Sequence, residues 1–157
     1  MIVQTLEEFD RLQESKWTQQ RDGRPPTKAR KLSPKDGNIK WTAWTAEAVF
    51  GRWRALPAKT YSFFRGRAVK LGGFRLVDNV PAHVAALCEV APGSICWDKE
   101  SKAMLVKCSA GWVAIKEAHI VGKRHGSSED FVNGYGLQQF KADNRFVYED
   151  REASTKK

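Results

Sequence analysis

The 157-residue sequence contains little cysteine: Cys88, Cys96 and Cys108 stand alone, without a Cys-x-x-Cys pair among them. A disulfide framework needs an even number of cysteines in a secreted chain, and a structural zinc site needs paired Cys or His ligands. The three histidines do not supply that spacing. The sequence therefore predicts neither a disulfide-linked nor a metal-binding domain, and we interpret the cysteines as buried thiols of a reducing compartment.

Long apolar runs are also missing, since no segment approaches the roughly 20 residues that a membrane-spanning helix needs. The first residues resemble neither a secretory signal nor an acid-poor presequence, because Glu7, Glu8 and Asp10 come early. The sequence has no Gly-x-Ser-x-Gly elbow, no phosphate-binding glycine loop with its lysine and no His-Glu-x-x-His. We therefore expect no membrane partner and no catalytic residue in this chain.

Positive charge is what the sequence has in excess, with 27 Lys and Arg against 18 Asp and Glu, a formal net charge of +9. Residues 21–44 contain seven basic and two acidic residues, and residues 45–77 contain seven and one. These two segments carry more than the whole net charge. A solvated basic face without a partner is one explanation, but such a concentration favours a polyanionic partner.

Composition and periodicity divide the chain into four parts. Residues 1–20 contain an amphipathic helix over residues 2–14, which is too short to be stable alone and so is assigned to a domain that precedes it. Residues 21–44 are a basic linker rich in Pro, Lys and Arg. Residues 45–142 carry the apolar patterns of a folded domain, and residues 143–157 are predicted to be a disordered tail.

The folded part begins with a helix and continues with strands. Thr45 is a good N-cap for a helix that Pro57 ends. The period then changes to two, which predicts a hairpin of residues 61–64 and 67–71 with its turn at Gly66.

The pattern beyond the hairpin predicts more strands and a closing helix. The expected elements are a continued strand at 74–77, a loop at 78–91, strands at 94–97, 103–108 and 112–117, and a short helix capped by Ser127 and Asp130. Five or so short strands with a helix at either end predict a mainly β domain built on a small closed barrel. An OB-fold fits this pattern, and so does an SH3-like barrel.

Several motifs of the sequence match one family in order and spacing. They are Ala29-Arg30-Lys31-Leu32, Ile39-Lys40-Trp41, Pro92-Gly93-Ser94-Ile95-Cys96-Trp97, the run from Met104 to Ile115, and the run from Ser127 to Tyr135. With these motifs the chain resembles the C-terminal domain of methionyl-tRNA formyltransferase, of the animal mitochondrial type. The family's common Asn-Pro-Trp-Pro-Gly segment is replaced here by Leu56-Pro57-Ala58-Lys59, as animal mitochondrial members also depart from it.

The resemblance implies an OB-like barrel and a function in translation initiation. The family transfers a formyl group from 10-formyltetrahydrofolate to initiator methionyl-tRNA, with the catalytic residues in an N-terminal formyl-folate domain that this chain does not contain. The resemblance therefore implies a tRNA-binding portion that takes no cofactor itself and is inactive alone. It also implies initiator methionyl-tRNA as the partner, a monomer, and the mitochondrial matrix as the location.

Basic side chains of the linker, the first helix and the hairpin are the candidate RNA ligands, because Arg and Lys pair with phosphate oxygens. They are Lys28, Arg30, Lys31, Lys35, Lys40, Arg52, Arg54, Arg65, Arg67 and Lys70. Trp44 is the best candidate for stacking on an unpaired base, with packing against the barrel as the alternative. The interpretation requires these cations to follow one continuous surface.

Two other interpretations stay open. The chain could be a related domain of another formyl-folate enzyme that binds no RNA, although its basic linker argues against this. It could also be a freestanding basic OB-like RNA-binding module, although the isolated helix of residues 2–14 argues against that.

Overall fold

The computed structural model describes residues 28–85 and 90–149. The chain divides into two units, Met1–Lys31 and Leu32–Lys157, and the fold reported below is that of the second. The helix predicted for residues 2–14 lies outside the described residues.

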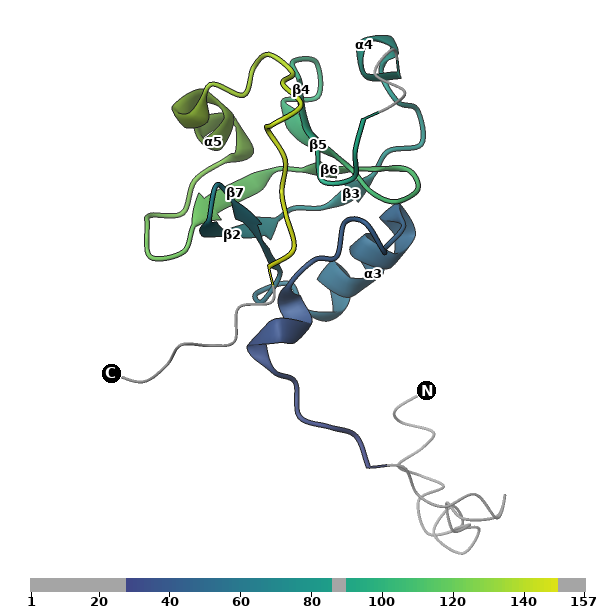
Figure 1. Ribbon diagram of the computed structural model, residues 1–157, viewed down its shortest axis with the longest axis vertical. Coiled ribbons are helices and arrows are strands. Elements are labelled where there is room, and N and C mark those ends of the chain that lie inside the picture. The colour runs from purple at the N-terminus through teal and green to yellow at the C-terminus, as the bar shows by residue number, and fades with distance from the viewer. Residues whose placement is uncertain (1–27, 86–89, 150–157) are drawn as a thin grey trace, which may run out of the picture. The chain divides into compact units, whose positions relative to one another are not determined.

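Helix α3 (Ala46–Ala55) begins where the sequence predicts it. The Thr45 side chain accepts a hydrogen bond from the Ala48 backbone N–H (3.3 Å), which satisfies one of the donors left open in the first turn. Val49 is completely buried, and the helix packs against β3 and β6 of the sheets described below (Figure 1). The predicted helix is confirmed.

The predicted hairpin is also confirmed. Strand β1 (Tyr61–Phe64) pairs antiparallel with β2 (Arg67–Gly72). The two turn residues Arg65 and Gly66 have φ angles of 47° and 72°. Two consecutive positive φ angles define the type I′ turn, whose twist suits a two-residue hairpin.

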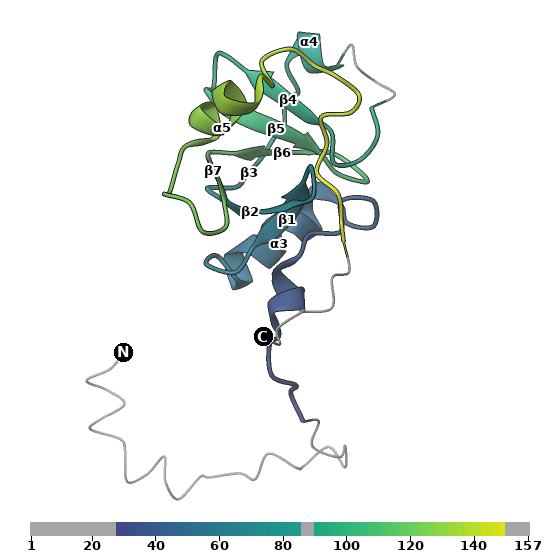
Figure 2. The same cartoon turned by 60° about the vertical axis from the view of Figure 1, so that its left-hand side comes forward.

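The strands form two antiparallel sheets. The first has the order β1-β2-β7, and the second has the order β3-β6-β5-β4. The bounds of the other strands are Arg75–Leu76 for β3, Ile95–Asp98 for β4, Ala103–Lys107 for β5, Trp112–Ile115 for β6 and Glu117–Ile120 for β7. This arrangement confirms the predicted fold class, a mainly β, OB-like domain with flanking helices, although the strands form two open sheets where a closed barrel was predicted (Figures 1 and 2).

The chain passes twice from one sheet to the other. The strand predicted to continue over residues 74–77 instead leaves the first sheet at Gly73, which has a φ of 64°, and enters the second sheet as β3. The single strand predicted for residues 112–117 is likewise two strands, β6 and β7, divided at Lys116. The Lys116 N–H donates to the Gly72 carbonyl (3.3 Å), so the two bends lie together.

A short helix occupies part of the predicted loop at residues 78–91. This helix, α4 (Ala82–Ala85), places Val84 against the second sheet, where it forms a small apolar cluster with Cys96, Leu105 and Trp112. Val84 thereby helps to cover one face of the second sheet. The other face of that sheet belongs to the main hydrophobic core, which includes Met104 and Val113.

Helix α5 (Ser128–Tyr135) has the predicted capping box, in which Ser127 and Asp130 bond to each other's backbone N–H groups. It ends at Gly136, which adopts a left-handed conformation with a φ of 65°. Phe131 is the buried residue of this helix that packs on the Phe64 ring, 5.4 Å between centroids.

The predicted linker of residues 21–44 contains part of the core, which corrects its description as a linker. A 3-10 turn, η1 (Pro34–Gly37), precedes Ile39 and Trp41, whose exposed fractions are 0% and 1%. The Trp41 Nε1–H donates to the Ser62 hydroxyl of β1 (2.8 Å). Residues 36–41 therefore belong to the folded domain.

The predicted disordered tail of residues 143–157 needs the same correction over residues 144–147, which join the two sheets. Val147 exchanges two backbone hydrogen bonds with Phe63 of β1, and the Ile95 N–H of β4 donates to the Asn144 carbonyl. These contacts connect the outer strands of both sheets. Residues 144–148, referred to below as the C-terminal segment, can be followed along the domain in Figures 1 and 2. Phe146 lies 1% exposed in the core between these bonds.

Candidate nucleic-acid interface

The predicted basic residues are distributed over both units of the chain. Lys28, Arg30 and Lys31 belong to the first unit and are exposed. The second unit carries Lys35, Lys40, Arg52, Arg54, Arg65, Arg67 and Lys70 on η1, α3, the β1–β2 hairpin and the residues between them.

Arg52 holds helix α3 against the η1 turn. Its Nε–H donates to the Asp36 carbonyl (2.9 Å), one of its terminal nitrogens lies 3.9 Å from the Asp36 carboxylate, and its guanidinium lies 4.8 Å from the centre of the Trp44 ring. Trp44 is half-buried and packs on the main core. Arg52 and Trp44 therefore support the fold, and their predicted contacts with RNA stay a prediction.

Two of the predicted cations, Lys40 and Arg65, meet the C-terminal segment at its two ends. The Lys40 ammonium lies 5.1 Å from the centre of the Tyr148 ring. Arg65 donates to the Asn144 side-chain carbonyl (3.1 Å) and lies over the Phe64 ring at 5.0 Å. The segment thus connects a cation of the predicted linker with a cation of the hairpin turn.

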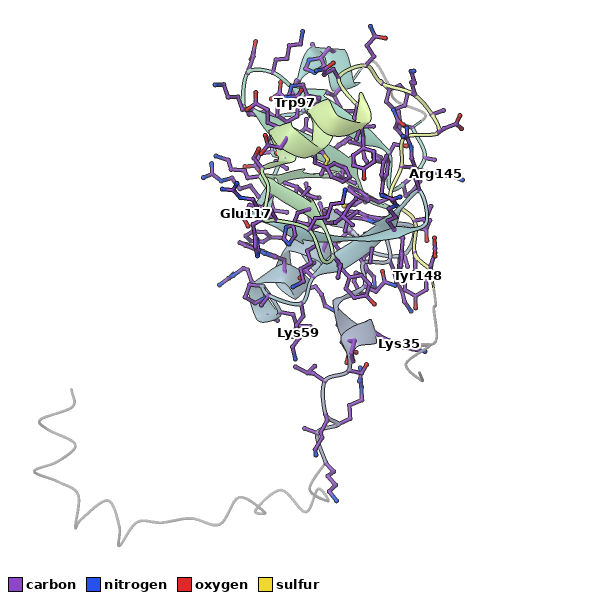
Figure 3. The ribbon with its side chains drawn as sticks, turned by 90° about the vertical axis from the view of Figure 1, so that its left-hand side faces the viewer. Lys35, Lys59, Trp97, Glu117, Arg145 and Tyr148 are labelled. Atoms are coloured by element: carbon purple, nitrogen blue, oxygen red, sulfur yellow. The ribbon has the colours of Figure 1, made fainter. Side chains whose placement is uncertain are left out.

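Arg145 adds a third positive charge on the same segment. It is exposed, and it lines one groove together with Tyr148, on the same side of the molecule in Figure 3. We refer to Lys40, Arg145 and Arg65 as the C-terminal cationic strip. Lys40 and Arg65 belong to the predicted residue set and Arg145 does not, and a continuous basic surface through all the predicted residues stays a prediction.

The other predicted residues are exposed on neighbouring elements. Arg54 lies over the Phe50 ring of its own helix at 5.9 Å. Arg67 begins strand β2, and Lys70 follows three residues later, paired with Tyr61 on one side and His119 on the other. Exposed cations on the first sheet extend the positive charge beyond the strip.

Sequence reasoning missed Arg145 because it assigned residues 143–157 to a tail. A signal was present in the sequence, since Phe146-Val147-Tyr148 is an apolar run within an otherwise polar segment. Phe, Val and Tyr are all enriched in strands, so the run indicates extended, partly buried backbone.

A pair of histidines lies beside Lys70 on the first sheet. The ring centres of His119 and His125 are 4.1 Å apart, and the buried Nδ1 atom of His119 has no hydrogen-bond partner within the part of the chain that the structure describes. Burial, the His125 ring and the Lys70 charge lower the pKa of His119 from its ordinary value of 6.5, although Glu117 opposes them. His119 therefore stays neutral in the folded protein at a pH where an unfolded chain already binds a proton.

This depressed pKa predicts a loss of stability in mild acid. The contribution of neutral His119 to folding stability is fully present above 6.5, the pKa of the residue in the unfolded chain. It falls as the pH drops below that pKa, because the unfolded state then binds more protons than the folded state. We expect the thermal midpoint to fall between about pH 7.5 and 5.5, and His119→Gln to reduce this dependence. Circular dichroism melts measure it, with His83→Gln as the control. An unchanged pH dependence in His119→Gln would contradict the assignment.

The cysteines behave as predicted where the structure describes them. Burial raises the pKa of Cys96 to about 11 and that of Cys108 to about 12, so both thiols stay protonated at neutral pH. Both are buried, which confirms that part of the prediction, and Cys88 lies outside the described residues. Residues 28–85 and 90–149 contain no group of three or more side chains suited to a metal ion. The described helices include none that is long and apolar enough to span a membrane.

Comparison with known proteins identifies the family. A family model described as the formyl transferase C-terminal domain matches residues 31–136. The mitochondrial methionyl-tRNA formyltransferases of Homo sapiens and Bos taurus are 29% and 31% identical over 120 and 115 residues, each covering 69% of this chain. The methionyl-tRNA formyltransferase of Caldicellulosiruptor saccharolyticus is 27% identical over 141 residues, or 88% of the chain.

Solved structures show the same fold. A crystal structure of a HypX variant from Aquifex aeolicus superposes with a TM-score of 0.54 at 19% identity, over 95% of this chain and 26% of that one. The chain spans 28% of the length of the human and bovine relatives and 42% of the bacterial one. The resemblance stated from the sequence is confirmed: the chain belongs to the formyl transferase C-terminal domain family.

Proposed function

We propose that this chain is the tRNA-binding C-terminal portion of a mitochondrial-type methionyl-tRNA formyltransferase. The observation that carries the proposal is the combination of this family's domain with the C-terminal cationic strip and the exposed cations of strand β2. Lys and Arg side chains on such a surface bind phosphate groups and hold an RNA without reading its sequence. The names of the relatives support methionyl-tRNA as the partner, and we take its initiator form as the one that this chain binds.

The length of the match indicates which functions of the complete enzyme we assign to this chain and which to the rest of the protein. The chain corresponds to about a quarter of the mitochondrial relatives, so we assign the formyl donor, 10-formyltetrahydrofolate, and the transfer reaction to the remaining part. The domain described here would position the tRNA for that part. The mitochondrial matrix is the proposed compartment because the human, bovine and rat relatives carry mitochondrial names.

A salt titration of tRNA binding tests the proposal. Contact with roughly four to six phosphates gives a slope of log K against log salt of about −3 to −5, because each neutralised phosphate releases counterions. Fluorescence anisotropy with labelled initiator tRNA measures this slope. A flat salt response, or tight binding of a folate ligand in place of tRNA, would contradict the proposal.

Charge removal on strand β2 locates the contacts. We expect Arg67→Gln and Lys70→Gln each to reduce the slope by about 1 if its side chain meets a phosphate. Lys99→Gln is the matched control, since Lys99 is also exposed but follows strand β4. A reduction of the same size in Lys99→Gln would show that the effect reflects total charge only.

A further inference from the structure

The C-terminal segment forms one wall of a groove with a volume of about 310 Å³. Trp41 and Thr42 line one part of this groove, and Pro92 and residues 145–148 line the rest. The volume lies at the lower end of the range for small-ligand sites, so it suits a single nucleotide better than a folded element. Residues 145–148 lie beyond the region matched by the family model, which ends at residue 136.

The floor of the groove is buried and aromatic. Trp41 and Phe146 are each 1% exposed, and their rings stack with 5.9 Å between centroids and 20° between planes. The Trp41 Nε1–H is fixed by its hydrogen bond to Ser62. Backbone bonds of Phe146 to Gly93 and of Val147 to Phe63 hold the wall in place.

The lining of the groove carries one accessible aromatic ring and one cation, and a second cation lies beside the ring. Tyr148 is 37% exposed, and the Lys40 ammonium lies 5.1 Å from the centre of its ring. Arg145 is exposed on the same wall, and none of the lining residues is acidic. An aromatic face beside Lys and Arg is the arrangement with which proteins bind single-stranded nucleic acid, because every base offers a face for stacking and each phosphate a charge.

We propose that this groove binds one unpaired nucleotide of an RNA ligand, with the base against Tyr148 and the phosphate between Lys40 and Arg145. The inference rests on the proposed function and deepens it, since it separates a site for single-stranded RNA from the general attraction of the basic surface for phosphates. Stacking contributes sequence-tolerant affinity at this site, and the groove therefore favours single-stranded over fully paired RNA.

The test uses the whole chain and two labelled RNAs, a single strand of about five nucleotides and a blunt hairpin, chosen because stacking requires unpaired bases. We expect Tyr148→Ala to weaken binding of the single strand by about tenfold, the scale of one lost base–aromatic contact, and to leave hairpin binding unchanged. Tyr148→Phe keeps the aromatic ring, so we expect it to bind the single strand as the unaltered chain does. Tyr148→Leu keeps an apolar side chain without a ring, so we expect it to bind the single strand more weakly. Phe140→Ala is the matched control, because Phe140 is 36% exposed and lies outside the groove.

The possible results separate the groove from the proposed function. Loss of affinity in Tyr148→Ala and Tyr148→Leu for the single strand alone supports the site. Equal losses for both RNAs, or none for either, overturn the site while tRNA binding by the unaltered chain upholds the proposed function. Failure of the unaltered chain to bind any RNA overturns both. Tighter binding of adenosine monophosphate than of the single strand overturns the RNA assignment, since the occupant is then a free nucleotide.

Discussion

Phe146→Ala is expected to lower the free energy of unfolding by about 3–5 kcal/mol, the usual cost of emptying a buried phenylalanine site. The Phe146 ring contacts three aromatic neighbours, with centroid distances of 5.9 Å to Trp41, 5.9 Å to Phe64 and 6.2 Å to Phe131. The backbone of Phe146 is fixed by its hydrogen bond to the Gly93 carbonyl (2.8 Å). The surrounding rings cannot close over the resulting cavity without breaking this arrangement.

Urea denaturation of the unaltered chain, Phe146→Ala and Phe140→Ala measures this effect. Phe140 is close in the sequence but 36% exposed, so its truncation is expected to cost less than about 1 kcal/mol. Equal stabilities of the two variants would mean that residues 144–147 do not pack in the core in solution. The sequence-based description of residues 143–157 as a tail would then be right.

The elements predicted correctly are those whose signals are local. Thr45 and the Ser127–Asp130 box cap helices through residues three positions away, and Arg65-Gly66 supplies the two positive φ angles of its turn. Each signal acts within a few residues and does not depend on the rest of the chain. The start of α3, the hairpin and the start of α5 could therefore be predicted from the sequence alone.

The elements that were missed depend on distant partners. Trp41 lies in a basic segment and Phe146 in a polar one, and each is buried because it stacks on the other across more than a hundred residues. Strand β7 was missed for a similar reason, because Lys116 interrupts the strand and only the pairing with β2 shows where the second sheet ends. The local periodicity of a sequence does not show which distant segments pair with each other.

The sequence predicted which segments of the candidate interface carry positive charge. It did not predict the contacts that the individual side chains make. Counting Lys and Arg located the surplus, and it included Lys40 and Arg65. The same count could not show that Arg52 bonds to Asp36, which lies 16 positions earlier. It also could not show that Arg145 and Tyr148 line one groove, because that groove depends on the packing of the C-terminal segment.

Gly93→Ala is expected to lower the free energy of unfolding by more than about 3 kcal/mol in total. Placing an L side chain in a left-handed conformation accounts for about 1–2 kcal/mol of this, and steric overlap accounts for the rest. Gly93 has a φ of 91°, and a methyl group on its Cα would overlap the Phe146 carbonyl oxygen. The Gly93 N–H donates to Lys107 (2.8 Å), and its carbonyl accepts from Phe146 (2.8 Å). Neither backbone can retreat without losing the hydrogen bonds that join the C-terminal segment to the second sheet.

Gly122→Ala is the control that separates strain from overlap. Gly122 has a similar φ of 87°, but no atom lies within 4 Å of the position that its Cβ would take. Its substitution should therefore cost only the conformational strain, about 1–2 kcal/mol. The excess measured for Gly93→Ala in urea denaturation then reports the close approach of residue 146. Equal costs at the two glycines would show that the C-terminal segment does not lie against Gly93, and the groove lined by Arg145 and Tyr148 would lose its wall.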